Sequence, residues 1–67
     1  MTVEDYCRQL RLWGLERVAG ETEKHARYAR NNGPKLWVRK PQGLTDEQRV
    51  AELRAFAREN RFDPPDT

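Results

Sequence analysis

The residues best suited to binding chemistry are six cations between residues 24 and 40, a stretch without any acidic residue. They are Lys24, Arg27, Arg30, Lys35, Arg39 and Lys40, which give this stretch a charge of +6. Residues 1–23 carry three Arg against five acids, and residues 41–67 carry four Arg against six, so each flank has −2 and the total is +2. Lys and Arg neutralise phosphates, while planar side chains such as Tyr28 and Trp37 stack on bases. The basic stretch therefore predicts a nucleic-acid-binding surface.

Double-stranded DNA is the partner that this stretch favours. The residues expected to contact it are Lys24, Arg27, Arg30, Asn31, Lys35, Arg39 and Lys40, with Asn31 or Asn32 as base readers. This hypothesis makes the chain a small non-catalytic DNA-binding regulator or accessory protein of a phage or mobile element. The competing interpretation is a solvated surface whose cations pair with the acidic flanks, since such surface pairs contribute little to stability.

A protein partner is the alternative, and it would dock through Leu36, Trp37 and Val38. The exposure of Trp37 separates the two hypotheses. An exposed Trp37 with Leu36 or Val38 also exposed favours a protein partner. A buried Trp37 that supports an outward row of Lys and Arg favours nucleic acid.

Catalysis and cofactor binding are not expected. Cys7 and His25 are the single cysteine and histidine, and Cys7 lies among apolar residues, where a free cysteine behaves as a small buried hydrophobe. One Cys and one His do not make a structural zinc site, which needs four ligands. The four glycines do not have the spacing of a phosphate-binding loop.

Two of the elements that must position these residues have clear helical signals. Thr2 with Asp5 forms a capping-box variant, and apolar residues then recur at helical spacing, which predicts a helix over residues 3–13. Thr45 with Gln48 forms a second capping box and predicts a helix over residues 45–60. Its expected buried stripe consists of Val50, Leu53, Phe56 and Ala57.

Between these helices the pattern is weaker. Leu15, Val18, Ala19, Thr22, Ala26 and Ala29 share one face at helical spacing, which favours a second helix that ends at the breakers Asn31 to Pro34. Such a helix would place Lys24, Arg27 and Arg30 on its outward side. Residues 35–40, between Pro34 and Pro41, favour an extended segment that has no strand partner within the chain.

The expected fold class is mainly α: a small three-helix domain over residues 1–62, with a short extended linker between the second and third helices. Phe62 is expected to fold back onto the core, and residues 63–67 to form a flexible tail. Residues 3–30 resemble the helical core-binding segment of tyrosine recombinases, through Glu4-Asp5-Tyr6, the run from Leu10 to Leu15, and then Thr22 and Tyr28. The resemblance covers less than half of the chain and omits the catalytic half, so it implies no residue roles.

Composition limits the remaining classes. Charged residues make up 36% of the chain and its mean hydropathy is −1.11. No apolar run reaches the roughly 20 residues of a membrane span, and the lone cysteine suits a reducing compartment, so a cytoplasmic location is expected. A chain of this size buries only about 60% of its unfolded surface. Self-association as a homodimer is therefore an open alternative.

Overall fold

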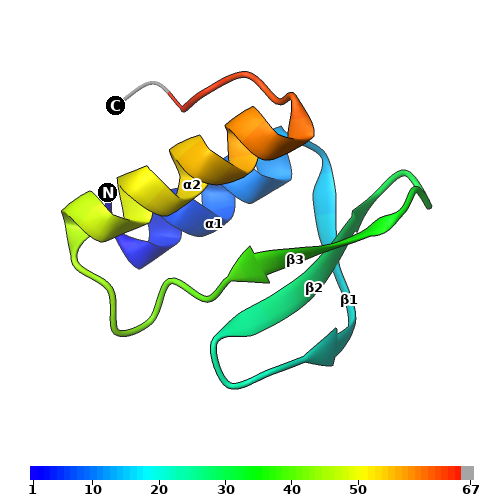
Figure 1. The fold of residues 1–67 in the computed structure, drawn as a ribbon, viewed down its shortest axis with the longest axis horizontal. Coiled ribbons are helices and arrows are strands. Elements are labelled where there is room, and N and C mark those ends of the chain that lie inside the picture. The colour runs from blue at the N-terminus through cyan, green and yellow to red at the C-terminus, as the bar shows by residue number, and fades with distance from the viewer. Residues whose placement is uncertain (66–67) are drawn as a thin grey trace.

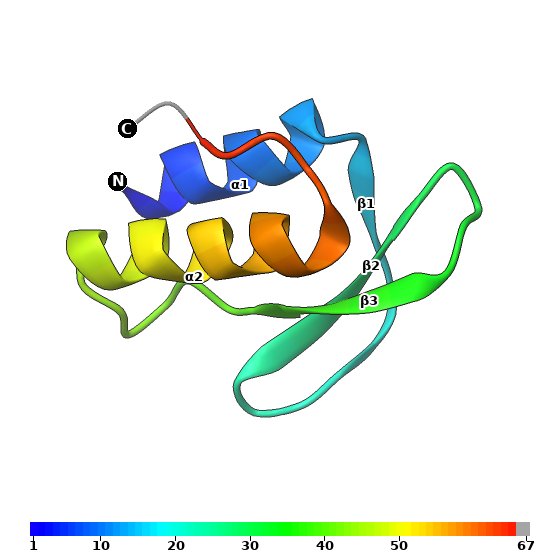
Figure 2. The same cartoon turned by 45° about the horizontal axis from the view of Figure 1, so that its top comes forward.

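The computed structural model describes residues 1–65 and contains two helices and three strands. In chain order they are α1 (Val3–Leu12), β1 (Leu15–Glu21), β2 (His25–Arg30), β3 (Lys35–Arg39) and α2 (Asp46–Asn60). The strands form one antiparallel sheet in the order β1-β2-β3, and both helices pack on the same side of it (Figures 1 and 2). The fold class is therefore α+β, and the expected mainly-α three-helix class is wrong.

The two helices begin where their capping residues predicted. The Thr2 hydroxyl accepts a hydrogen bond from the Asp5 backbone N–H at 3.1 Å, and the Thr45 hydroxyl accepts one from Gln48 at the same distance. In return, the backbone N–H of each cap residue donates to the side-chain oxygen of the third helical residue, Thr2 to Asp5 at 3.5 Å and Thr45 to Gln48 at 2.9 Å. These bonds satisfy backbone donors that a helix start would otherwise leave without a partner.

The expected second helix is wrong, because residues 15–30 form β1 and β2 instead. Asn31 and Asn32 have φ of +50° and +59°, and the Gly33 N–H donates to the Arg30 carbonyl at 2.8 Å. Two successive positive φ values make a hairpin turn, for which Asn is well suited. The cluster at residues 31–34 thus reverses a strand and does not end a helix. The helical segment implied by the recombinase resemblance is likewise absent over β1 and β2.

The prediction that residues 35–40 lack a strand partner is also wrong. β3 pairs with β2 along its whole length, with Arg27 opposite Trp37 and Ala29 opposite Lys35. Of the six residues with helical spacing, three are Ala and one is Thr22 in the turn between β1 and β2, and such small side chains would bury little area on a helix face. Pairing of β2 with β1 on one side and with β3 on the other supplies both β1 and β2 with a backbone ladder and with cross-strand contacts.

β1 contains an irregularity where its register against β2 shifts between Arg17 and Glu21. The Arg17 guanidinium fills this gap and donates to the backbone carbonyls of Val18, Gly20 (3.1 Å) and Arg27 (3.3 Å). A bulge removes ladder hydrogen bonds, so these side-chain donors satisfy carbonyls that would otherwise lack them.

The core lies between the sheet and the two helices. Its buried residues are Tyr6, Leu10, Trp13, Leu15, Val38, Leu53, Phe56 and Ala57. Phe62 packs against this core, as predicted, and its ring stacks on Trp13 with centroids 5.3 Å apart. The Trp13 Nε1–H donates to the Asp63 carbonyl at 2.8 Å, which ties the chain after α2 to α1. Of the expected tail over 63–67, residues 66 and 67 lie outside the described residues.

Candidate nucleic-acid interface

The two faces of the sheet differ, because side chains alternate along each strand. Leu36 and Val38 of β3 point toward the core, so Lys35, Trp37 and Arg39 point away from the helices. Their partners in the β2 ladder share that orientation, and neither α1 nor α2 covers this side (Figure 2). We call this surface the open face, and its residues are Glu16, His25, Arg27, Ala29, Lys35, Trp37 and Arg39.

Arg27 and Trp37 occupy the middle of the open face. The Arg27 guanidinium carbon lies over the Trp37 indole at 4.6 Å from the ring centroid, which is within cation–π range. On its other side the stem of Arg27 lies against Gly20 of β1, where a Cβ atom would come within 3.2 Å of the Arg27 Cδ. The arginine is thus confined between an aromatic ring and a glycine.

Half of the six predicted cations reach the open face, namely Arg27, Lys35 and Arg39. Lys24 is exposed in the turn between β1 and β2. Arg30 and Lys40 lie on the helix side: Arg30 is over the Phe62 ring at 5.3 Å, and Lys40 forms an ion pair with Glu21 at 2.5 Å. The predicted single row on a helix does not form, because a strand sends alternate residues to opposite faces.

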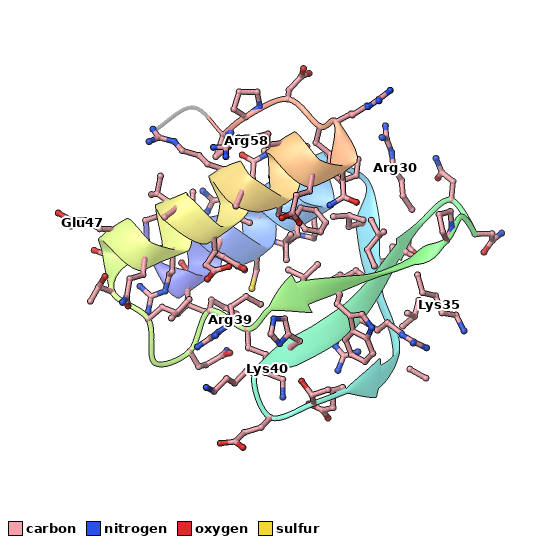
Figure 3. All side chains as sticks on the ribbon, viewed as in Figure 1. Arg30, Lys35, Arg39, Lys40, Glu47 and Arg58 are labelled. Atoms are coloured by element: carbon pink, nitrogen blue, oxygen red, sulfur yellow. The ribbon has the colours of Figure 1, made fainter. Side chains whose placement is uncertain are left out.

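The hairpin between β2 and β3 presents Asn31 and Asn32 at one end of the sheet, where both are exposed. Figure 3 shows Lys35 near this end, whereas Arg39 and Lys40 lie toward the other end of β3. The positive φ values of the two asparagines account for their presence in the turn. Their amides remain available beside the open face.

The exposure of Trp37 meets neither of the two conditions set from the sequence. Trp37 is 44% exposed, whereas Val38 is 2% exposed and Leu36 is half-buried against the core. The apolar patch expected for a protein partner is therefore limited to Trp37. The arrangement is instead an exposed indole with a cation stacked on it.

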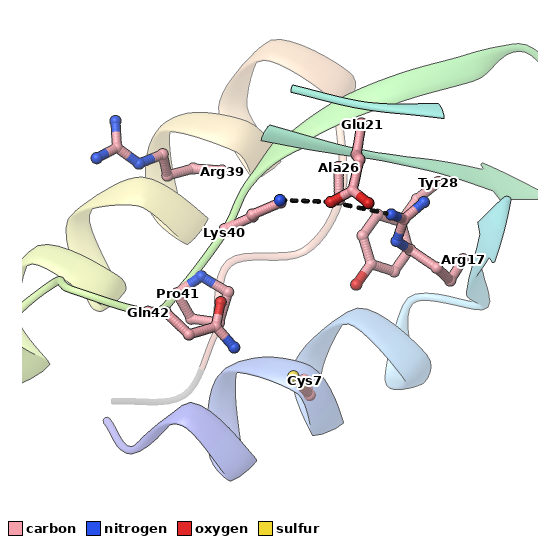
Figure 4. A pocket seen from close by; sticks show the side chains of 9 residues that line it. All are labelled: Cys7, Arg17, Glu21, Ala26, Tyr28, Arg39, Lys40, Pro41 and Gln42. Carbon is pink, nitrogen blue, oxygen red and sulfur yellow. Dashed lines mark hydrogen bonds and ion pairs between the residues drawn. The ribbon is translucent and has the colours of Figure 1, made fainter. Parts of the chain in front are cut away.

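The helix side of the sheet carries a polar cavity of about 280 Å³ between α1 and the strands, with Cys7, Tyr28 and Lys40 in its lining (Figure 4). Glu21 accepts a hydrogen bond from Lys40 there, and this bond, with the positive charges of Lys40 and Arg17, lowers the pKa of Glu21. Burial raises the pKa of Tyr28. The cations Lys40 and Arg17 are thus already engaged by a carboxylate, unlike Arg27.

Cys7 and His25, the single cysteine and the single histidine, line separate cavities. Cys7 faces the strands from α1, while His25 lies on the open face opposite Arg39. Within residues 1–65, no three His, Cys, Asp or Glu side chains form a group that could hold a metal ion.

Two residues with structural roles in the sheet, Gly20 beside Arg27 and Arg17 at the bulge, were not identified from the sequence. Gly20 falls inside the second helix expected from the sequence, whereas its φ of +116° and missing side chain make room for Arg27. Arg17 was counted only as a charge, whereas it supplies hydrogen bonds at the bulge. An isolated glycine inside a strand is the sequence signal of a bulge, but it requires that the strand be recognised first.

No protein-family model, no curated protein and no solved structure matches this chain. None of the helices in the described part of the chain is long and apolar enough to cross a membrane.

Proposed function

We propose that this chain binds double-stranded DNA through the open face of its sheet, as a small non-catalytic regulator or accessory protein in the cytoplasm. The observation that supports this is the cluster of Arg27, Lys35 and Arg39 around the exposed Trp37. Among the described residues of the open face, Glu16 is the single acid. A cationic surface of this kind attracts phosphates and tolerates any base sequence at first contact.

The dimensions of the β2–β3 ribbon suit the major groove of B-DNA. Neighbouring strands lie roughly 4.8 Å apart, and a groove about 12 Å wide admits a two-stranded ribbon with its side chains. In that position Lys35 and Lys24, near opposite ends of the ribbon, would approach the phosphate backbones. Asn31 and Asn32 would enter beside the bases with the hairpin turn.

The acids at the start of α2 are placed where they would not oppose this contact, whereas Glu52 and Glu59 line a cavity with Trp37 and Arg39 at the edge of the open face. Asp46 and Glu47 lie in the first turn of α2, and Glu47 is at the opposite end of the molecule from Lys35 in Figure 3. Such charge asymmetry orients a protein as it approaches a polyanion. The open face therefore meets the DNA, and the start of α2 points away from it.

The proposal is tested by titrating random duplex DNA at increasing salt with three proteins: the wild type, a Lys24→Ala/Lys35→Ala variant, and an Arg11→Ala/Arg58→Ala control. The control removes the same charge from the two helices, and Figure 3 shows Arg58 remote from Lys35. Each lost phosphate contact reduces the slope of log affinity against log salt by about 1. We expect a reduction of about 2 for the lysine variant and an unchanged slope for the control.

Two results would count against the proposal. Equal losses in the lysine variant and in the helix control would remove the open face as the binding surface. Absence of wild-type binding at low salt would reject DNA binding altogether. The second candidate function, a small adaptor or inhibitor, would then lead, because Trp37 is 44% exposed and could anchor a protein partner.

A further inference from the structure

The position of Arg27 is fixed by the sheet register. The Lys40 N–H donates to the Lys24 carbonyl at 2.8 Å, so residues 24 and 40 form a hydrogen-bonded pair at the end of the β2–β3 ladder. Such pairs alternate with non-hydrogen-bonded pairs, in which opposite side chains come closest. Counting along the ladder makes Arg27 and Trp37 a non-hydrogen-bonded pair. This explains why the guanidinium lies over the indole.

Arg27 has no anionic partner within residues 1–65. Its Nε is buried and has no hydrogen-bond acceptor there. Arg17 and Arg49, by contrast, each donate to backbone carbonyls and pair with a carboxylate. Stacking covers the flat side of a guanidinium, and because Nε is buried, the donors left for an external acceptor are those of Nη1 and Nη2. Arg27 is thus a held, planar donor group whose hydrogen-bonding capacity the protein does not use.

A planar fork of N–H donors is matched best by two acceptors in one plane. In the major groove guanine alone presents two, O6 and N7, whereas adenine presents one acceptor beside a donor. We infer that Arg27 reads a guanine in the major groove, and that Trp37 and Gly20 act as positioning residues that hold its side chain flat. This inference rests on the proposed function, since it requires the β2–β3 ribbon to lie in that groove.

A held arginine gains in discrimination because less rotamer freedom is lost when the contact forms. Lysine at this position would keep the charge but lose the fork, since an ammonium is a point charge with rotatable donors. The bidentate contact can also be made to a phosphate, which carries no sequence information. The experiment must therefore separate contact with a base from contact with the backbone.

The probe is a duplex selected from a random pool by the wild-type protein at physiological salt, resynthesised with 7-deazaguanine at one guanine at a time. This replacement removes N7 and leaves every phosphate in place. We expect one position at which it weakens wild-type binding by about tenfold, because one hydrogen bond from a charged donor is lost while O6 remains as an acceptor. The ratio of the affinities for the unmodified and the modified duplex should fall in Arg27→Lys, because an ammonium lacks the planar fork, and it should also fall in Trp37→Leu. Lys35→Ala should weaken both duplexes by the same factor.

The outcomes separate this inference from the proposed function. Salt-dependent wild-type binding without any 7-deazaguanine effect would overturn the reading of guanine by Arg27 and leave DNA binding standing. An Arg27→Lys variant that keeps the full effect would also overturn it. If Trp37→Leu left the ratio of the affinities for the unmodified and the modified duplex unchanged, Trp37 would have no positioning role. Absence of wild-type binding to duplex DNA would overturn both proposals together.

Discussion

Replacement of Gly20 by alanine tests whether the stem of Arg27 lies where the structure places it. Gly20 has a φ of +116°, and an added Cβ would lie 3.2 Å from the Arg27 Cδ. The substitution therefore introduces two separate costs. One is a backbone conformation that residues with a side chain rarely adopt, and the other is displacement of an arginine that is already confined by Trp37.

The two costs can be given magnitudes. A residue held in a sparsely populated backbone region costs of order 1–3 kcal/mol, and pushing a side chain off its rotamer costs about 0.5–1.5 kcal/mol. We expect Gly20→Ala to lower the free energy of unfolding by about 2–3 kcal/mol. A domain of this size has roughly 3–10 kcal/mol in total, and each kcal/mol shifts its Tm by about 4–8 °C. The loss is thus a large part of the stability.

A matched control and a second background separate the two costs. Gly43 also has a positive φ, +79°, but nothing lies within 4 Å of the position of its Cβ. Gly43→Ala should therefore show a backbone cost of about 1–2 kcal/mol only. In an Arg27→Ala background the steric part disappears, so Gly20→Ala should cost about 1 kcal/mol less there than in the wild type. Urea unfolding of the variants followed by circular dichroism supplies these differences.

The reasoning would be refuted if Gly20→Ala cost the same in the wild-type and Arg27→Ala backgrounds. Gly20 and Arg27 would then not be in contact, and the confinement of Arg27 would rest on Trp37 alone. A Gly20→Ala variant as stable as the wild type would refute the backbone argument as well.

Two further predictions concern the contacts that close the fold. Tyr6 is 1% exposed and its hydroxyl donates to the Arg39 carbonyl at 2.6 Å. Tyr6→Phe should therefore lower the free energy of unfolding in urea by about 1–2 kcal/mol. An unchanged urea midpoint would show that this hydrogen bond does not stabilise the fold. The Lys40 ammonium, by its hydrogen bond and charge, holds the pKa of Glu21 below its ordinary 4.5. The contact therefore contributes its full stability above pH 4.5, and this contribution is lost as the pH falls through the lowered pKa of Glu21 in the folded protein. Glu21→Gln should therefore show a smaller loss of stability on acidification than the wild type, measured as the urea midpoint against pH; parallel curves would contradict this.

The helices could be predicted because their signals are local. Thr2 and Thr45 each reach a backbone donor three residues later, so a few neighbouring residues determine where each helix begins. The apolar stripe of α2 was confirmed at Leu53, Phe56 and Ala57, which are buried. Such features need no knowledge of the rest of the fold.

The sheet could not be predicted in the same way. Ala26 and Ala29 are buried on opposite faces of β2, so the alternation of polar and apolar residues over residues 25–28 breaks at Ala29 and spans only four residues. The same two residues, three apart, fit a helix face equally well. The decisive information was the turn at Asn31 and Asn32, which was interpreted as the end of a helix. Once that turn is recognised, β3 becomes the partner of β2.

The candidate site was predicted in composition but not in arrangement. The basic stretch does contain the cations of the open face. These cations are divided between the two faces of the sheet because side chains alternate along a strand, and a helical interpretation does not predict this division. The stacking of Arg27 on Trp37 links two residues ten positions apart. That contact depends on the register between β2 and β3, which is set by the hairpin turn.

The charges of β3 also affect how the sheet meets other copies of itself. Along β3, alternate residues direct their backbone hydrogen bonds to opposite sides. Those of Leu36 and Val38 point toward β2, so the N–H and carbonyl groups of Lys35 and Trp37 point to the outer edge of the sheet. An unpaired edge invites aggregation by strand addition. A second copy paired antiparallel about Trp37 would bring Lys35 opposite Arg39, and like charges at directly opposite positions destabilise a ladder. The cations that we propose for contact with DNA therefore also discourage the chain from joining its sheets into aggregates.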